Sequence, residues 1–490
     1  MAPGRAEDAR VLSIDVGSSS VRAALHDASG DSLEGTETKL DYEFDYTADG
    51  GATQDADELL NLVAQAIDGA LSQGDGAPVS GVATSTFWHS VLGLNGDNRP
   101  TTPILTWADR RAADAAARLR ERLDEEDVHR RTGCVLHSSY WPAKLLWLSG
   151  EDPDALERTE RWVSPADYFS ERFFGGGPAV GTSMASATGL FDQNNLRWDH
   201  EILESLPARR EQLSQISDEP RRGLRPGWAE RWPALRDVPW FPAVGDGACS
   251  NIGCGAVGTD RLALMVGTSG AMRVLWKADA VKVPEGPWCY RADARRFVMG
   301  GALSDGGNLV EWLRETLRLP DPEQTERQLS EMEPDSHGLT FLPILNGERG
   351  PGWADRANGT IASLSMSNKP IDIMRAAMEA IALRFALIAE ILEDAFPKKK
   401  EVIATGGGLL NSPTWTQIMA DALGKPVTIS GVKEASSRGA ALLALEALGE
   451  LEIEDAEAPL GETFRPDPEG HEAYLRALNR QRKLYEAVLQ

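Results

Sequence analysis

The sequence predicts an α/β protein with two domains built on a duplicated core, and three observations lead to this prediction. The chain has 490 residues, which is too many for one hydrophobic core and favours two domains. Near the N-terminus, a turn rich in glycine and serine separates two apolar runs within residues 11–25. The same pattern returns over residues 262–274. Such internal similarity indicates a repeated structural unit.

The two turns are typical of hairpins that bind phosphate. Small residues let backbone N–H groups approach an anion closely, and hydroxyl side chains add further donors. Arg22 can also face a phosphate, and Asp15 can hold a hydrated Mg²⁺ ion. Either turn alone would fit an ordinary edge hairpin better, but one in each half predicts a nucleotide between the halves. The turn residues are Gly17, Ser18 and Ser19, and Gly267, Thr268 and Ser269.

Composition narrows the class of protein. The net charge of −25 and the pI of about 4.8 argue against nucleic acids and anionic membranes, which select basic surfaces. The four cysteines have spacings that fit neither a zinc site nor a disulfide framework. The first ten residues lack an apolar signal core, and no apolar run is long enough to span a bilayer. We therefore expect a soluble, reduced, cytoplasmic protein.

In the first half, apolar residues at helical spacing predict a helix over residues 55–73, and strands are expected at 79–87, 91–94 and 104–106. His89 follows the end of the first of these strands, and the group Trp107, Asp109 and Arg110 follows the end of the third. Imidazole and carboxylate groups hydrogen-bond hydroxyls, and an indole ring stacks on a carbon face, so this set suits a polyhydroxy substrate. A buried structural histidine and a surface ion pair are the alternative interpretation.

Asp246 is the candidate catalytic carboxylate. It stands between two glycines at the start of a helical run, where the helix dipole favours its ionised form. A plain helix cap is the alternative at this position.

In the second half, strands are expected at 297–303 and 402–404, and a long buried helix at 373–392. A turn of three glycines, residues 406–408, links the second strand to a helix at 413–423 and is a further candidate nucleotide site. Helices at 436–448 and 471–489 close the chain.

Taken together, these stretches resemble the FGGY family of carbohydrate kinases over nearly the whole chain, and the gluconokinases most within that family. Residues 87–90, 104–112 and 267–273 carry the closer likeness, and the chain departs from the usual pattern by the bulk of Trp88 and Trp141. The resemblance implies the actin-like ATPase (ribonuclease H-like) fold, with a duplicated core and ATP in the interdomain cleft. It also implies an N-terminal domain at 1–253 and a C-terminal domain at 254–490.

The resemblance also implies roles for single residues. Asp246 matches the general base, and Asp15 and Asp246 match the residues at Mg²⁺. His89, Trp107 and Asp109 fall where the family binds its sugar. The positions that match the nucleotide site are Gly17, Ser18, Ser19, Arg22, Gly267, Thr268, Ser269, Gly307, Glu311, Gly407 and Asn411.

The resulting hypothesis is an ATP-dependent sugar kinase that uses Mg²⁺ and phosphorylates the 6-hydroxyl of D-gluconate. A xylulokinase or other pentulose kinase is the alternative within the class. A nucleotide-binding regulator without catalysis and an actin-like ATPase are the alternatives outside it. The expected partners are ATP and a sugar or sugar acid, without nucleic acid or membrane, and a homodimer is left open.

Overall fold

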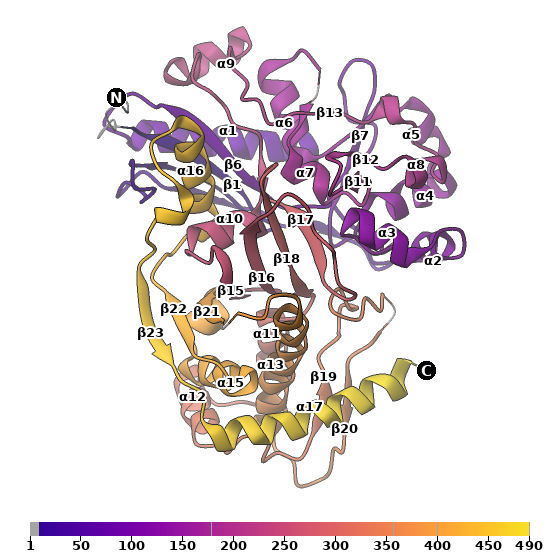
Figure 1. Cartoon of the computed structure of the whole chain (residues 1–490), viewed down its shortest axis with the longest axis vertical. Helices are drawn as coiled ribbons and strands as arrows, with labels where there is room; N and C mark the ends of the chain where they lie inside the picture. Colours follow the sequence, from indigo (N-terminus) through magenta and orange to yellow (C-terminus); the bar gives the residue numbers. More distant parts are fainter. Residues whose placement is uncertain (1–8, 178, 356, 399, 490) are drawn as a thin grey trace.

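Figure 1 shows the computed structural model, which describes residues 9–177, 179–355, 357–398 and 400–489. The N-terminal half is built on a five-stranded sheet in the order β14-β6-β1-β2-β3. β1 is antiparallel to β2 and parallel to β6; β14 is parallel to β6, and β3 is antiparallel to β2. The strands are β1 (Val11–Val16), β2 (Ser20–His26), β3 (Thr38–Asp41), β6 (Gly81–Thr86) and β14 (Val244–Gly245).

The C-terminal half is built on a seven-stranded sheet in the order β17-β18-β16-β15-β21-β22-β23. Five neighbouring strands repeat the order and directions of the first sheet, with β15 and β16 in the place of β1 and β2. The predicted duplicated core is therefore confirmed, and the fold is the actin-like ATPase fold. The strands are β15 (Gly258–Val266), β16 (Gly270–Lys277), β17 (Trp288–Arg291), β18 (Arg296–Leu303), β21 (Glu401–Thr405), β22 (Val427–Ser430) and β23 (Leu460–Phe464).

Equivalent helices precede the parallel strand of each half. α1 (Ala56–Gln73) covers the first sheet, and its N-cap Asp55 accepts a hydrogen bond from the backbone N–H of Glu58. α13 (Pro370–Ala395) is largely buried in the core of the second half. Both helices were predicted, because their apolar residues recur at a spacing of three and four. α11 (Gly307–Thr316), α12 (Pro322–Ser330), α14 (Gly407–Leu410), α15 (Pro413–Leu423) and α17 (Pro468–Leu489) complete the second half.

Two helices cross where the halves meet. α10 (Asp246–Gly253) packs on α16 (Ala435–Leu448), and α16 lies among the N-terminal elements in Figure 1 although it comes late in the chain. A Cβ atom on Gly253 would lie 1.8 Å from the carbonyl oxygen of Ala435. A Cβ on Gly439 would lie equally close, 1.8 Å, to the carbonyl oxygen of Cys249. The two backbones can approach this closely only because both positions are glycine.

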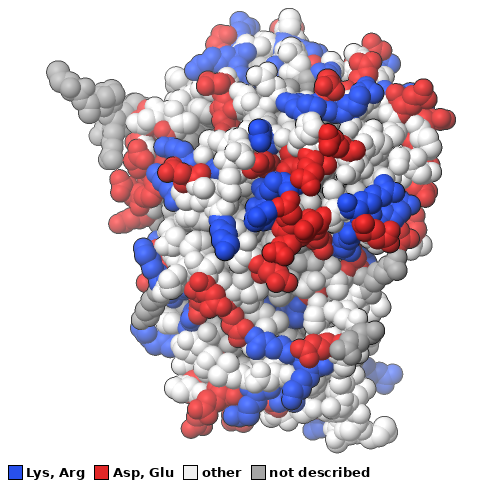
Figure 2. Space-filling model, turned by 45° about the vertical axis from the view of Figure 1, so that its right-hand side comes forward, with Lys and Arg blue, Asp and Glu red and all other residues white. Residues whose placement is uncertain are grey.

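Smaller elements surround the two sheets, and most of them belong to the N-terminal half. The four cysteines are free and buried. None of the described helices is long and apolar enough to cross a membrane. On the face shown in Figure 2, acidic and basic side chains are interspersed. The smaller helices and strands are β4 (Asp45–Tyr46), β5 (Ala52–Gln54), β7 (Leu92–Leu94), β8 (Ile104–Leu105), α2 (Ala113–Arg120), α3 (Glu125–Thr132), α4 (Trp141–Glu151), α5 (Pro153–Arg158), β9 (Arg161–Val163), α6 (Pro165–Phe174), β10 (Ala179–Val180), α7 (Thr182–Ser186), β11 (Phe191–Asp192), β12 (Arg197–Trp198), α8 (His200–Glu204), β13 (Gln215–Ile216), α9 (Pro226–Arg231), β19 (Thr340–Leu342) and β20 (Thr360–Ala362).

Candidate active site

Asp246 is the first residue of α10, directly after β14, and it lies between the two halves of the molecule. Its Oδ1 accepts a hydrogen bond of 2.7 Å from the backbone N–H of Gly247. Burial raises the pKa of Asp246 above its ordinary value, although the positive charges of Arg273 and Arg349 act in the opposite direction. A carboxylate with a raised pKa is a better proton acceptor than an exposed one.

His89 lies with Asp246 in one pocket, which we call the sugar pocket. Its Nδ1 is 2.7 Å from the carbonyl oxygen of Ala187, and because a carbonyl only accepts, Nδ1 carries the proton. Burial, and then the charge of Arg349, hold the pKa of His89 well below its ordinary value. The ring is therefore neutral at pH 7, and its Nε2 is free to accept a hydrogen bond from a substrate hydroxyl.

Trp107 forms another wall of the sugar pocket. Its indole N–H donates a hydrogen bond of 3.0 Å to Oγ of Ser18 in the first turn. The guanidinium of Arg349, from the C-terminal half, lies 4.8 Å from the centre of the Trp107 ring. Trp107 therefore links the first phosphate-type turn to a side chain of the opposite half.

The structure does not bring Asp109 into the pocket. Its Oδ1 accepts hydrogen bonds from the Nε of Arg111, at 3.0 Å, and from the backbone N–H of the same residue, at 3.1 Å. The guanidinium of Arg111 in turn lies over the ring of Trp147. This is an ion pair, as in the alternative interpretation, but the Asp109 carboxylate is buried and does not lie at the surface. Arg110 donates to the backbone carbonyl of Asp355 at 3.0 Å, which joins the two halves.

Asp15, at the end of β1, supports a cation site. Its Oδ1 is buried and has no hydrogen-bond partner among the described residues. Burial raises the pKa of Asp15 to about 7, and the charges of Asp246 and Glu434 act in the same direction. Arg22 is shared between Asp15, at 3.9 Å, and Glu434, at 3.4 Å, so its charge is only partly available to Asp15. An unsatisfied carboxylate oxygen near a second carboxylate fits a hydrated Mg²⁺ ion.

A second pocket, which we call the nucleotide pocket, lies in the C-terminal half. Apolar side chains from α13 and α15, among them Met374, Met378 and Trp415, form one wall. Six residues predicted for the nucleotide site line this pocket: Gly267, Thr268, Gly307, Glu311, Gly407 and Asn411.

The glycine turns at the nucleotide pocket pack backbone against backbone. The N–H of Gly307 donates to the carbonyl oxygen of Gly267 at 2.7 Å, and a Cβ on Gly307 would lie 2.5 Å from that oxygen. Gly406 has a φ of +88°, and a Cβ there would lie 2.4 Å from the carbonyl oxygen of Val266. The turns therefore require glycine, and their backbone remains accessible from the pocket.

A wider cleft joins the two pockets. Ser18, Ser19, Thr268 and Ser269 line it together with Asp246. Both turns therefore face one cavity, with Asp246 between them. Gly17 and Arg22 do not line the described pockets; the N–H of Gly17 closes the turn by donating to the carbonyl oxygen of Ser20 at 2.9 Å.

The sugar pocket is also lined by side chains that can bind or pack against a substrate but had no role assigned from the sequence. Among them are Arg273, Trp288, Tyr290 and Arg349. The rings of Trp288 and Tyr290 stack with centroids 4.4 Å apart, and Trp88 packs edge-on against both. Arg273 lies at the end of the stretch 267–273 that carries the likeness to gluconokinases, and this was the one signal that could have identified it.

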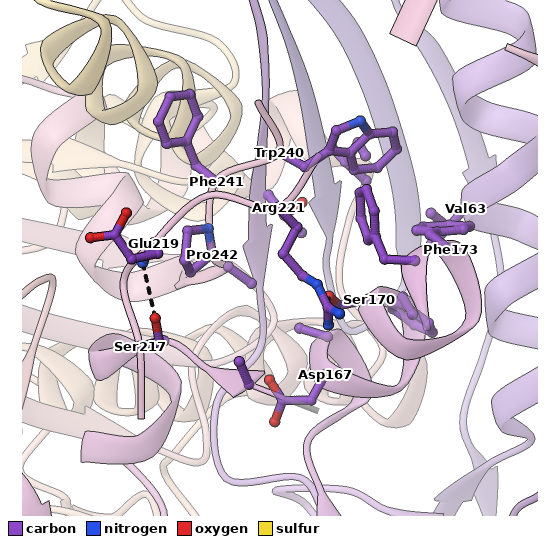
Figure 3. A pocket seen from close by; sticks show the side chains of 18 residues that line it. Val63, Asp167, Ser170, Phe173, Ser217, Glu219, Arg221, Trp240, Phe241 and Pro242 are labelled. Atoms are coloured by element: carbon purple, nitrogen blue, oxygen red, sulfur yellow. Dashed lines mark hydrogen bonds between the residues drawn. The ribbon is translucent and has the colours of Figure 1, made fainter. Parts of the chain in front are cut away.

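Figure 3 shows another cavity, on the N-terminal half. Phe173 and Trp240 contribute aromatic rings to its wall, and Asp167, Glu219 and Arg221 are its charged members. Ile14 and Thr84 line it, and these alternate along β1 and β6 with Asp15 and Ser85, so the cavity lies on the opposite face of the sheet. Its lining includes none of the predicted site residues that the structure describes.

The fold and the site define the class as a two-domain kinase with a cleft between duplicated halves. The chain belongs to the FGGY family of carbohydrate kinases, whose N-terminal domain matches residues 10–253 and whose C-terminal domain matches residues 262–448.

Among its relatives, a gluconokinase of Bacillus subtilis is 28% identical over 94% of this chain and 91% of its own. The crystal structure of a xylulose kinase from Lactobacillus acidophilus matches with a TM-score of 0.90 and 26% identity, covering 98% of both chains. The crystal structure of a gluconate kinase from the same organism matches with a TM-score of 0.88 and 27% identity, also covering 98% of both chains.

Proposed function

We propose that the protein transfers the γ-phosphoryl group of ATP to the 6-hydroxyl of D-gluconate, with Asp246 as the general base. The observation that carries this proposal is the position of Asp246. It lines both the sugar pocket and the cleft that leads past Thr268 to the nucleotide pocket. An acceptor in the first pocket and ATP in the second would therefore meet at this carboxylate.

In the proposed reaction, the acceptor oxygen attacks the γ-phosphorus as Asp246 takes the hydroxyl proton. His89 orients the acceptor through a hydrogen bond to Nε2, and Trp107 packs against its carbon chain. The hydroxyls and backbone N–H groups of the two turns bind the phosphates. Asp15 and Asp246 would hold Mg²⁺, which supplies charge neutralisation at the phosphate oxygens when bound.

Exclusion of water is the remaining requirement, because water competes with the sugar as phosphoryl acceptor. The loop that contains Asp355 comes from the C-terminal half and is held on the N-terminal half near the pocket. Asp355 Oδ1 accepts a hydrogen bond of 2.7 Å from the hydroxyl of Ser138 and lies 2.6 Å from Nε2 of His137. We expect these contacts to keep the two halves closed over the acceptor.

The choice of gluconate is supported by the gluconokinase relative and by the likeness of residues 267–273. Xylulose is the alternative, because a xylulose kinase structure is similarly close. A regulator would need neither Asp246 nor Asp15, and an ATPase would need no polyol pocket, so both are less well supported.

We also propose the domain boundary at residue 253, a cytoplasmic location and ATP with Mg²⁺ as the working pair. Four free thiols support the location, because oxidising compartments favour disulfides. The assembly state, including a homodimer, stays a prediction.

The experiment is a coupled measurement of ADP release with gluconate, xylulose, ribulose, glycerol and no acceptor. A response specific to gluconate is expected. A ketose response would overturn gluconate and keep the kinase mechanism. Equal turnover with and without acceptors would favour the ATPase. ATP binding without turnover on any acceptor would favour the regulator.

A further inference from the structure

The sugar pocket carries more positive than negative charge. The acidic and basic side chains that line it, besides His89, are Asp246, Arg273 and Arg349. His89 is neutral at pH 7, because its pKa lies well below its ordinary value. One guanidinium charge therefore has no counterpart in the pocket wall. A neutral polyol leaves this charge unpaired in a buried place, whereas an anionic acceptor compensates it.

Arg273 is a buried side chain of β16, only 5% exposed. Its Nε donates to Oδ1 of Asn251 at 3.0 Å, and Nδ2 of Asn251 donates to the carbonyl oxygen of Arg273 at 3.3 Å. The first contact orients the guanidinium, and the second holds Asn251 in place. Its Nη2 is buried and has no hydrogen-bond partner among the described residues. A donor held in place without an acceptor is unfavourable unless a ligand supplies one.

Arg349 reaches the pocket from the loop that follows β19. Its guanidinium lies 4.8 Å from the centre of the Trp107 ring, and its Nε is buried without a hydrogen-bond partner in the described part of the chain. The adjacent Glu348 does not neutralise it, because Glu348 pairs with Arg384 and accepts a hydrogen bond from Tyr485. Arg349 therefore offers a second unpaired N–H at the same pocket.

We infer that Arg273 and Arg349 bind the carboxylate of the acceptor, so that the pocket selects a sugar acid over a neutral sugar of the same length. This inference rests on the proposed function and assigns its specificity to two residues. Guanidinium groups match the planar geometry of a carboxylate and form strong charge-assisted hydrogen bonds with it. The carboxylate at one end of the chain would pair with the two arginines while the hydroxyl at the other end lies at Asp246.

The test compares D-gluconate with D-glucitol, which has the same six-carbon chain and no charge. Binding without ATP is followed by the fluorescence of the tryptophans in the pocket, and turnover by ADP release. We expect Arg273→Gln to weaken gluconate binding about 10- to 100-fold, the usual loss for a buried charged hydrogen bond, and to leave glucitol binding unchanged. Arg349→Gln should act in the same direction, and Arg273→Lys should restore part of the loss.

Arg482→Gln is the control, because Arg482 is a surface residue of α17 that pairs with Glu390. Thermal melting establishes that each variant is folded; should Arg273→Gln not fold, Arg349→Gln and Arg273→Lys carry the comparison. Equal losses for gluconate and glucitol would overturn the inference in favour of a role at the phosphoryl group. Unchanged gluconate binding in both glutamine variants would overturn it as well. A wild-type protein that prefers another sugar acid would support the inference and overturn gluconate. One that prefers a neutral ketose would overturn both and keep the kinase mechanism.

Discussion

The substitution Asp246→Asn tests the general base most directly. Asparagine has the same shape and keeps an oxygen that can accept the hydrogen bond from the N–H of Gly247, 2.7 Å long in this structure. It cannot take a proton and is a weaker ligand for Mg²⁺ than a carboxylate, so the chemical step should suffer most. General-base catalysis contributes about 10²- to 10⁴-fold in rate, which sets the expected loss in kcat. Because burial raises the pKa of Asp246, the carboxylate is a strong proton acceptor, and its loss should place the effect toward the upper end of that range.

Nucleotide binding should be largely unchanged, because the lining of the nucleotide pocket does not include Asp246. Titration with a fluorescent ATP analogue measures this, and ADP release with gluconate measures the rate. Asp279→Asn is the matched control, since Asp279 is an exposed carboxylate away from the pockets. A variant that keeps more than about a hundredth of the wild-type kcat would refute the role of Asp246 as base, because even the lower limit of general-base catalysis would then be missing.

Three further predictions follow from single residues. Asp15→Asn should raise the Mg²⁺ concentration needed for half-maximal activity several-fold and leave binding of metal-free ATP intact; an unchanged Mg²⁺ requirement would exclude Asp15 from the cation site. Burial lowers the pKa of His26 to about 4, from 6.5 when unfolded, so the unfolded chain binds more protons between these values. The free energy of unfolding should therefore fall as the pH drops from 6.5 toward 4, by roughly 3 kcal/mol, and the urea midpoint of His26→Gln should depend less on pH over this window; an equal dependence would contradict the assignment. Gly439→Ala should destabilise the protein by about 1–3 kcal/mol through overpacking, whereas Gly150→Ala, with open space around its Cβ position, should not; equal melting temperatures would contradict the close helix crossing.

The sequence predicted the fold well where residue patterns are strong. The repeated hairpin indicated two related halves, and the apolar spacing of residues 55–73 and 373–392 predicted the helices α1 and α13. Neither pattern could show that α16 lies on the sheet of the opposite half. The spacing of apolar residues in a buried helix is the same whichever core the helix packs into.

The sequence predicted some residues of the candidate site and missed others. The glycine turns were informative because only glycine tolerates the backbone contacts at Gly307 and Gly406. Asp109 was expected at the sugar, but its partner Arg111 is two residues away, and the sequence alone could not separate an ion pair from a ligand. Arg349 was missed because it lies far along the chain from Trp107, and only the closed arrangement of the halves brings the two together.

The position of α16 bears on how the chain folds during synthesis. Ala440, Ala441, Ala444 and Leu445 form one apolar cluster with residues of the N-terminal sheet, including Val11 and Ala83. When only the first 253 residues have emerged from the ribosome, one apolar face of the N-terminal sheet is therefore uncovered. The helix that covers it, α16, comes almost two hundred residues later. The N-terminal half should remain incomplete until the chain is nearly finished, and a fragment cut at residue 253 should aggregate. The boundary between the two halves at residue 253 is therefore not a boundary between independently folding units.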